Sequence, residues 1–165
     1  MNAPQQFEYQ QSTDLLGAEV FQEKVEYAGF WLRFAAYIID AILLSIFEWV
    51  LLAIIGLDGS FNIENGEFVL SKDYWSTVMI NSAVNIAYFA FMESSQWQGT
   101  LGKRAVGIKV TDLQGNRIGL GRALGRYLGK IVSAFTLLIG FIMAGFTERK
   151  QALHDMMAST LVVKS

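Results

Sequence analysis

Three long apolar runs lie between polar and charged segments, and they set the first expectation for the fold. The first run, AGFWLRFAAYIIDAILLSIFEWVLLAIIGL, begins at Ala28 and has Arg33, Asp40 and Glu48 as its charged residues. A membrane-spanning helix needs about 20 mostly apolar residues. This run also lacks the 3.6-residue polar stripe of a helix with a wet face. It therefore predicts a first transmembrane helix over about residues 31–56.

The second apolar run, YWSTVMINSAVNIAYFAFMESS, predicts another transmembrane helix over about residues 74–95. Tyr74 and Trp75 stand at one end of the run, and Trp97 follows the other end. Aromatic side chains favour the two membrane interfaces, so these positions agree with a helix that crosses the bilayer.

The third apolar run, LGKIVSAFTLLIGFIMAGF, covers residues 128–146 and is interrupted by Gly140. It could cross the membrane fully, or it could enter and return, which is allowed where protein buries the irregular backbone. Arg149, Lys150 and the strand-like ending STLVVKS favour a cytoplasmic C-terminus. A bent, re-entrant element is therefore favoured, and a full crossing is the alternative.

Two short patterns predict β-structure outside the apolar runs. FNIENGEFVL, in the 58–73 loop, has the Asn-Gly pair of a tight hairpin turn at residues 65–66. VGIKVTDLQGNRIGL alternates around a turn at residues 114–116 and predicts a second hairpin. The C-terminal STLVVKS could also pair with the GIKVTD part of this segment.

Charge is distributed unevenly and orients these elements. Residues 98–130 hold seven basic side chains against Asp112, whereas the 58–73 loop and residues 1–27 are acidic. The positive-inside rule places 98–130 in the cytoplasm, the 58–73 loop outside and the N-terminus inside. The chain therefore divides into an acidic cytoplasmic tail over residues 1–27, which lacks the basic start of a signal peptide, and a transmembrane domain over residues 28–165.

The composition agrees with this picture. Hydrophobic residues make up 53% of the 165 residues and charged residues 17%, against roughly 25% charged in average soluble domains. The expected fold is an all-α polytopic membrane protein with two full transmembrane helices, the third apolar element and a small cytoplasmic β-like hairpin. Its partner is the lipid bilayer, and no nucleic acid is expected.

The chemistry available to the chain is limited. Cysteine is absent and there is one histidine, so neither a thiolate site nor a histidine-rich metal site is expected. No nucleophile–base set and no cofactor-binding loop is recognisable, so we expect no cofactor and no enzymatic activity. His154 is expected to be structural, with a proton relay as the alternative.

Arg33 and Asp40 are the first candidate site residues, because they lie inside the first predicted helix. Seven residues separate them, which places them on one face and about 10 Å apart along the axis. A charge inside a bilayer costs at least about 2.5 kcal/mol, so such residues normally face partners. Arg33 could reach the inner headgroups or pair with Asp40. Asp40 is then either half of a structural ion pair or a carboxylate that binds a proton or a cation.

Further polar residues could complete such a site. Glu48 lies eight residues beyond Asp40, either at the outer interface or deeper in the membrane. Asn81 and Asn85 share one face of the second predicted helix with Tyr88 and can reach a neighbouring helix. Interhelical amides usually serve packing, but these could also coordinate a cation beside Asp40.

A basic stripe precedes the third apolar run. Arg122, Arg126 and Lys130 recur every four residues beside a row of glycines with the same spacing. This pattern predicts a helix at the membrane surface, with the three basic side chains facing anionic lipid headgroups.

Three motifs in order resemble the RDD family of small bacterial membrane proteins, named for one arginine and two aspartates. GFWLRFAAYIID has Arg33 and Asp40 where the family has its first pair, and GTLGKRAVGIKVTDLQGNRIGLGRALGRYLGK resembles the central signature. ERKQALHDMMASTLVVKS resembles the family's ending, which makes Asp155 the second aspartate. The resemblance covers about residues 28–164, and Glu48 is not part of the family pattern.

The resemblance implies the fold and a bacterial inner-membrane location more firmly than an activity. A role in transport is suspected for the family, cation/proton antiport has been proposed for some members, and no cofactor is implied. With a cytoplasmic C-terminus, Asp155 could clamp the inner end of the first helix and share Arg33 with Asp40.

We therefore expect a secondary transporter that exchanges a monovalent cation for a proton. Asp40 would carry the ion, Arg33 would be its charge partner, and Asn81 and Asn85 would be neutral ligands. Because so small a chain has little room for a pathway, a homo-oligomer is expected. The alternative is a non-transporting membrane scaffold or assembly factor, whose acidic tail recruits a protein partner.

Overall fold

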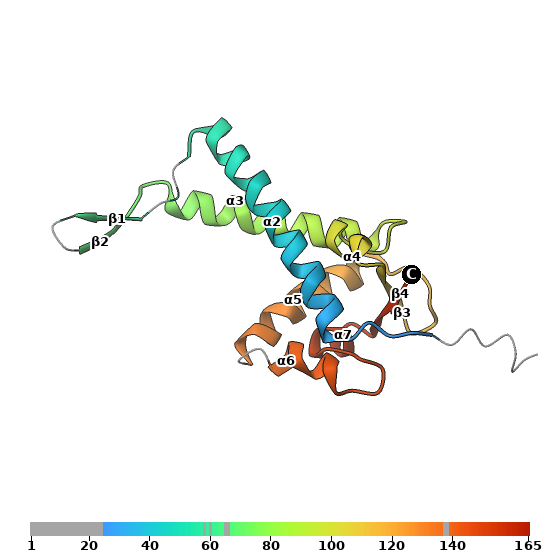
Figure 1. Cartoon of the computed structure of the whole chain (residues 1–165). Helices are drawn as coiled ribbons and strands as arrows, with labels where there is room; N and C mark the ends of the chain where they lie inside the picture. Colours follow the sequence, from blue (N-terminus) through green and yellow to red (C-terminus); the bar gives the residue numbers. More distant parts are fainter. Residues whose placement is uncertain (1–24, 58, 60, 65–66, 137–138) are drawn as a thin grey trace, which may run out of the picture.

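The computed structural model describes residues 25–57, 59, 61–64, 67–136 and 139–165. Nearly all of the acidic tail, and the Asn-Gly turn at 65–66, lie outside these residues. Figure 1 shows two long helices that cross, with a small hairpin projecting from one end of the pair. A second group of short elements packs at the other end, beside the C-terminus.

The first apolar run forms helix α2, Phe30–Ile55. It ends at Gly56, whose φ of 77° is a left-handed conformation that glycine adopts without strain. At 1.5 Å per residue its 26 residues span about 39 Å. Within the described residues, α2 is the single continuous helix that is long and apolar enough to cross a membrane, and almost none of it is buried inside the molecule.

The second apolar run forms helix α3, Tyr74–Ser94. It is 21 residues long, but its two asparagines and Glu93 make it less apolar than α2. It does not satisfy the length and composition criterion that α2 meets. The helix predicted here is thus present, while the number of membrane spans stays a prediction.

The third apolar run is bent rather than straight. Helix α5, Leu120–Phe135, begins eight residues before the predicted start, and helix α6, Ile139–Ile142, continues into the 3₁₀ turn η1, Met143–Gly145. The axes on the two sides of the break differ by 118°. The arms meet closely, since a Cβ on Gly140 would lie 2.8 Å from Cβ of Ser133.

After this bend the chain returns to the end of the molecule from which α5 began. Helix α7, Leu153–Met157, packs on α5 and leads into strand β4, Thr160–Lys164. β4 pairs antiparallel with β3, Ile108–Asp112, which precedes α5. The predicted pairing of the C-terminal run with GIKVTD is therefore confirmed, and it agrees with an element that enters and comes back.

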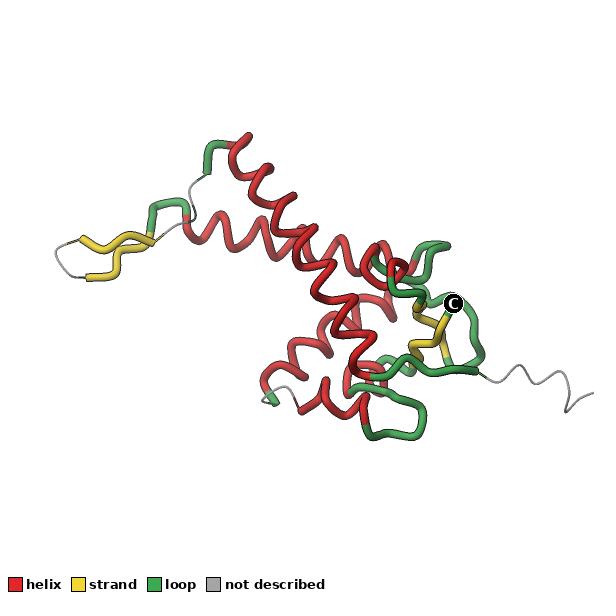
Figure 2. The backbone as a smooth tube through the Cα atoms, in the orientation of Figure 1, coloured by secondary structure: helices red, strands yellow, loops and turns green. Residues whose placement is uncertain are grey.

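The hairpin predicted around residues 114–116 is wrong. Asp112 accepts hydrogen bonds from the amides of Gln114 and Asn116, which closes a tight turn. The residues after this turn form no strand, because both edges of β3 are already occupied. One edge pairs with β4, and on the other edge the Val110 amide donates a hydrogen bond to the Gln98 carbonyl. The hairpin predicted in the 58–73 loop is confirmed: β1, Phe61–Glu64, pairs with β2, Glu67–Leu70, and projects from the helices (Figure 2).

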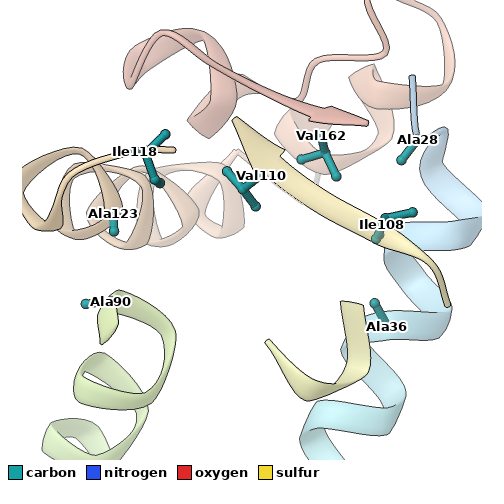
Figure 3. Packing of buried hydrophobic residues seen from close by; sticks show 8 residues of the cluster. All are labelled: Ala28, Ala36, Ala90, Ile108, Val110, Ile118, Ala123 and Val162. Atoms are coloured by element: carbon teal, nitrogen blue, oxygen red, sulfur yellow. The ribbon is translucent and has the colours of Figure 1, made fainter. Parts of the chain in front are cut away.

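A small apolar core holds the short elements together. Val110 of β3 and Val162 of β4 face Ile118 and Ala123, and Ala28 and Ile108 lie toward the start of α2 (Figure 3). Helix α4, Leu101–Ala105, sits beside this core and packs on α2. The core therefore joins the start of α2, the end of α3 and the start of α5.

Helix α5 is inside out compared with a helix of a soluble protein. Its buried residues include Arg126 and Ser133. Its exposed residues form an apolar face: Leu120, Leu124, Leu128, Ile131, Val132 and Phe135. Soluble helices bury the apolar face and expose the polar one, and an exposed apolar surface of this kind fits contact with lipid.

Candidate functional site

Arg33 of α2 contacts Asp155 of α7, so the predicted contact between the first helix and the His-Asp turn is present. Nη1 of Arg33 pairs with Oδ2 of Asp155. The other guanidinium nitrogens donate to backbone carbonyls, Nε to Ala28 at 2.9 Å and Nη2 to Lys150 at 2.6 Å. Nη1 and Nη2 thus fasten the C-terminal segment to the start of α2, while Nε binds the backbone just before the helix.

Asp155 is completely buried and is held by charge. Its Oδ1 lies 2.7 Å from Nη1 of Arg126, and its Oδ2, which also pairs with Arg33, accepts from the Ala152 amide at 3.0 Å. Burial alone would raise the pKa of this carboxyl, but the guanidiniums of Arg126 and Arg33 outweigh it and hold the pKa well below its usual range. Asp155 is therefore a permanent anion, which suits an anchor rather than an exchangeable proton site.

The prediction that Arg126 and Lys130 face lipid headgroups is wrong. Arg126 is 1% exposed, and its Nε lies 3.0 Å from Oε2 of Glu93 in α3. Nζ of Lys130 lies 3.4 Å from the other oxygen of Glu93 and 4.0 Å above the Phe89 ring. Both side chains point inward because Glu93 supplies the charge that compensates their burial. Arg122 remains exposed.

A third cation reaches Glu93 from helix α4. Nζ of Lys103 lies 2.5 Å from Oε1 of Glu93. Together these contacts define a charged cluster of four cations and two carboxylates, drawn from α2, α3, α4, α5 and α7: Arg33, Glu93, Lys103, Arg126, Lys130 and Asp155. The cluster is a chain of alternating charges that ties five helices at one end of the molecule.

Asp40 does not share Arg33, so the predicted Arg33–Asp40 pair is wrong. Asp40 is 1% exposed and accepts from neutral donors instead. Oδ1 receives the Tyr88 hydroxyl at 2.7 Å and the Gly102 amide at 2.8 Å, and Oδ2 receives the Thr100 hydroxyl at 2.5 Å. The seven-residue spacing puts both side chains on one face of α2. However, α4 packs against Asp40, while Arg33 pairs with Asp155 of α7.

Glu48 of α2 contacts Asn85 of α3, a pairing that the sequence pattern did not specify, since it placed Asn85 beside Asp40. Nδ2 of Asn85 donates to Oε1 of Glu48 at 2.5 Å and to the Asn81 carbonyl at 2.9 Å. Oδ1 of Asn81 is buried and has no hydrogen-bond partner among the described residues, and the same holds for Oγ1 of Thr77 one turn further along α3. A polar α2–α3 seam thus runs between the two helices: Asp40, Glu48, Thr77, Asn81, Asn85 and Tyr88.

His154 lies in the wall of the charged cluster. Its Nε2 is 3.4 Å from Oδ1 of Asp155, and its ring lies 5.3 Å from that of Phe141. Burial lowers the pKa of His154 to about 3, more than Asp155 raises it. The imidazole is therefore neutral at ordinary pH, and no described residue is a partner for its buried Nδ1. Among the described residues, no three His, Asp or Glu side chains could hold a metal ion.

Sequence reasoning missed the central position of three residues. These residues are Glu93, Lys103 and Thr77, none of which the sequence pattern singled out as a site residue. A signal existed for Glu93, since a carboxylate at the inner end of an apolar helix demands a cation. None existed for Thr77, because threonine is common in such helices.

Known proteins resemble this chain over the segment that contains these residues. The model of the RDD family matches residues 27–159. An uncharacterized protein of Bacillus subtilis, YxaI, is 36% identical over 82% of this chain and 96% of its own length. The uncharacterized membrane protein YteJ of the same organism is 32% identical over 83% of this chain and 80% of its own length. No solved structure matches the chain.

Proposed function

The chain belongs to the RDD family, with a membrane protein among its relatives, and on this premise we propose that it exchanges a monovalent cation for a proton. The exchange takes place along the α2–α3 seam of a bacterial inner-membrane protein. In this proposal the N-terminus and the charged cluster are cytoplasmic, α2 and α3 cross the bilayer, and the α5–α6 bend is re-entrant. The protein works as a homo-oligomer.

One observation supports this proposal above the others: α3 has unpaired buried oxygen atoms in the same stretch of the helix that contacts a carboxylate of α2. Oδ1 of Asn81 and Oγ1 of Thr77 are buried without partners among the described residues. Asn85, one turn from Asn81 on α3, donates to Glu48 of α2. Buried polar atoms normally have partners, so such atoms call for a ligand or water. Oxygen ligands with a single negative charge suit a monovalent cation.

Glu48 is the exchanging carboxylate in this mechanism. It can hold a proton or a cation but not both, because either one neutralises its charge and competes for the same oxygens. Asn85 orients the carboxylate through its amide group, and Asn81 and Thr77 supply neutral oxygens on the path along α3. Coupling follows from this competition, since a cation leaves Glu48 when a proton arrives.

Asp40 and the charged cluster hold the helices in this proposal and do not carry the ion. The oxygens of Asp40 already accept three hydrogen bonds from Tyr88, Thr100 and Gly102. A carboxylate whose oxygens already accept three hydrogen bonds has little capacity left for a cation. Glu48 therefore replaces Asp40 as the expected carrier.

The test is cation-dependent proton flux in proteoliposomes with Na⁺, Li⁺ or K⁺ in the opposite compartment. We expect flux with at least one cation in the unchanged protein and at least a tenfold loss in Glu48→Gln, which keeps the shape but removes the charge. Glu67→Gln on the exposed hairpin is the matched control and should leave flux unchanged.

Two results would contradict the proposal. Full flux in Glu48→Gln, with loss in Asp40→Asn, would return the carrier role to Asp40. An absence of flux in folded protein under both directions of the pH gradient would favour the scaffold alternative, in which the acidic tail recruits a partner. A pull-down with and without residues 1–24 would then be the next experiment.

A further inference from the structure

The charged cluster holds more positive than negative charge. Its four cations face two carboxylates, Glu93 and Asp155, so two positive charges are in excess among the described residues. His154, in the wall of the cluster, does not add to this excess because its imidazole is neutral at ordinary pH. Taking an ion out of water is costly unless an opposite charge compensates it. A further negative charge would therefore stabilise the cluster.

The two arginines of the cluster are compensated by the contacts that they make. Arg33 pairs with Oδ2 of Asp155, and its other nitrogens donate to backbone carbonyls. Arg126 contacts Oδ1 of Asp155 and Oε2 of Glu93. It also donates to the Thr160 hydroxyl at 2.7 Å. The arginines thus occupy three of the four carboxylate oxygens of the cluster, and Oε1 of Glu93 is left for the two lysines.

Lys103 of α4 and Lys130 of α5 share that one oxygen. Nζ of Lys103 lies 2.5 Å from Oε1 of Glu93, and Nζ of Lys130 lies 3.4 Å from it, so the two nitrogens are at most about 6 Å apart. An ammonium group has three N–H donors. Each lysine uses one of them on Glu93, and the Phe89 ring covers a further side of Lys130. The lysine pair therefore has donors to spare and too little negative charge beside it.

The lysine pair is also the part of the Glu93 contacts that solvent can reach. The side chains of Lys103 and Lys130 are 10% and 22% exposed, whereas those of Glu93 and Arg126 are 1% exposed. An ion that arrives from solvent therefore meets the lysines first, and one small ion can contact both nitrogens across the gap between them. Because Glu93 lies beside the pair and repels other anions, a single negative charge is opposed less than a double one.

We propose that Lys103 and Lys130 bind one small monovalent inorganic anion, such as chloride, beside Oε1 of Glu93. The anion accepts hydrogen bonds from both ammonium groups and compensates one of the two excess positive charges. It thereby stabilises the contact of α4 and α5 with the end of α3. The site is separate from the proposed cation–proton exchange, because the anion is held in place and is not transported, and it can be tested without any measurement of flux.

The test measures chloride binding to the full chain in detergent micelles by equilibrium dialysis with chloride-36. We expect saturable binding that levels off at about one chloride per chain. Lys103→Gln and Lys130→Gln, which remove one charge each, should weaken it at least tenfold. Arg122→Gln is the matched control, because it removes a positive charge from an exposed side chain of α5 outside the cluster, and it should bind chloride like the unchanged protein.

A second measurement needs no variant, since a ligand that binds the folded state raises the melting temperature. Replacement of gluconate by chloride at constant sodium should raise the melting temperature of the unchanged protein until the site is full. The proposal is overturned if folded protein binds no chloride saturably, or if both anions stabilise it equally. It is also overturned if chloride binds only after residues 1–24 are removed, because the acidic tail would then compensate the lysines, or if anionic lipid stabilises the protein and chloride does not.

Discussion

At the scale of single residues, buried charges pair across distant parts of the sequence, Arg33 with Asp155 and Arg126 with Glu93. The Arg33–Asp155 contact was predictable, since the family resemblance and the expected cytoplasmic position of the C-terminus put both residues at one end. The inward direction of Arg126 was not. A helix with one apolar and one basic face can turn either face to the protein, and only the position of Glu93 on α3 decides which.

Arg126 is the residue whose loss should cost most. Arg126→Ala leaves Glu93 and Asp155 without the cation that both contact. Removing one partner of a buried ion pair typically costs about 3–5 kcal/mol. We expect a loss of this size in the free energy of unfolding, measured in mixed detergent micelles. Arg122→Ala is the control, since the side chain of Arg122 is 51% exposed and lies 3.7 Å from Asp112. This variant should lose less than about 1 kcal/mol. Equal losses in the two variants would show that the buried pairs are not stabilising.

At the scale of elements, the first two helices were predicted to within one residue at each end, whereas the third run was not. Hydropathy gives the position of α2 and α3, but it does not show that the third run breaks after Phe135 and turns by 118°. The choice of strand partner was equally open. The segment after Asp112 and the C-terminal run both have strand-like sequences, and the return of the chain through α7 brings the second of them to β3.

Helix α4 provides the sharpest test of packing between elements. In Gly102→Ala the new methyl group would overlap the Ala36 carbonyl oxygen, so α4 must move away from Asp40. Overpacking of this kind costs about 1–3 kcal/mol, and we expect a lower melting temperature together with faster proteolysis near residue 105. Gly121→Ala, where no atom lies within 4 Å of the added Cβ, is the control. If it were as destabilised as Gly102→Ala, the close approach of α4 and α2 would not be the cause.

At the scale of the whole molecule, the exposed surface is apolar along α2 and α5, and the polar groups are gathered inside. This is the reverse of a soluble domain and fits a protein that lies in lipid. The β3–β4 pair brings residues 108–112 and the C-terminus to one end, which agrees with an α5–α6 element that does not cross.

Topology can be read from single cysteines in the cysteine-free chain. We expect Val69→Cys, on the exposed outer hairpin, to react with an impermeant maleimide in intact cells. Met157→Cys, in α7, is also exposed, yet it should react only after the membrane is opened. Labelling of both positions from outside would show that the third element crosses and that the C-terminus is external.

Membrane class, the positions of the long helices and the family could all be read from the amino-acid sequence. These properties depend on local composition and on short motifs, which a linear pattern contains. Which polar groups meet depends on the tertiary structure. Asp40 contacts α4 instead of Arg33, Arg126 contacts Glu93 instead of lipid, and Glu48 contacts Asn85. Each of these contacts joins residues 33 or more positions apart, and such a meeting depends on how helices cross and bend, which hydropathy and spacing along one helix do not specify.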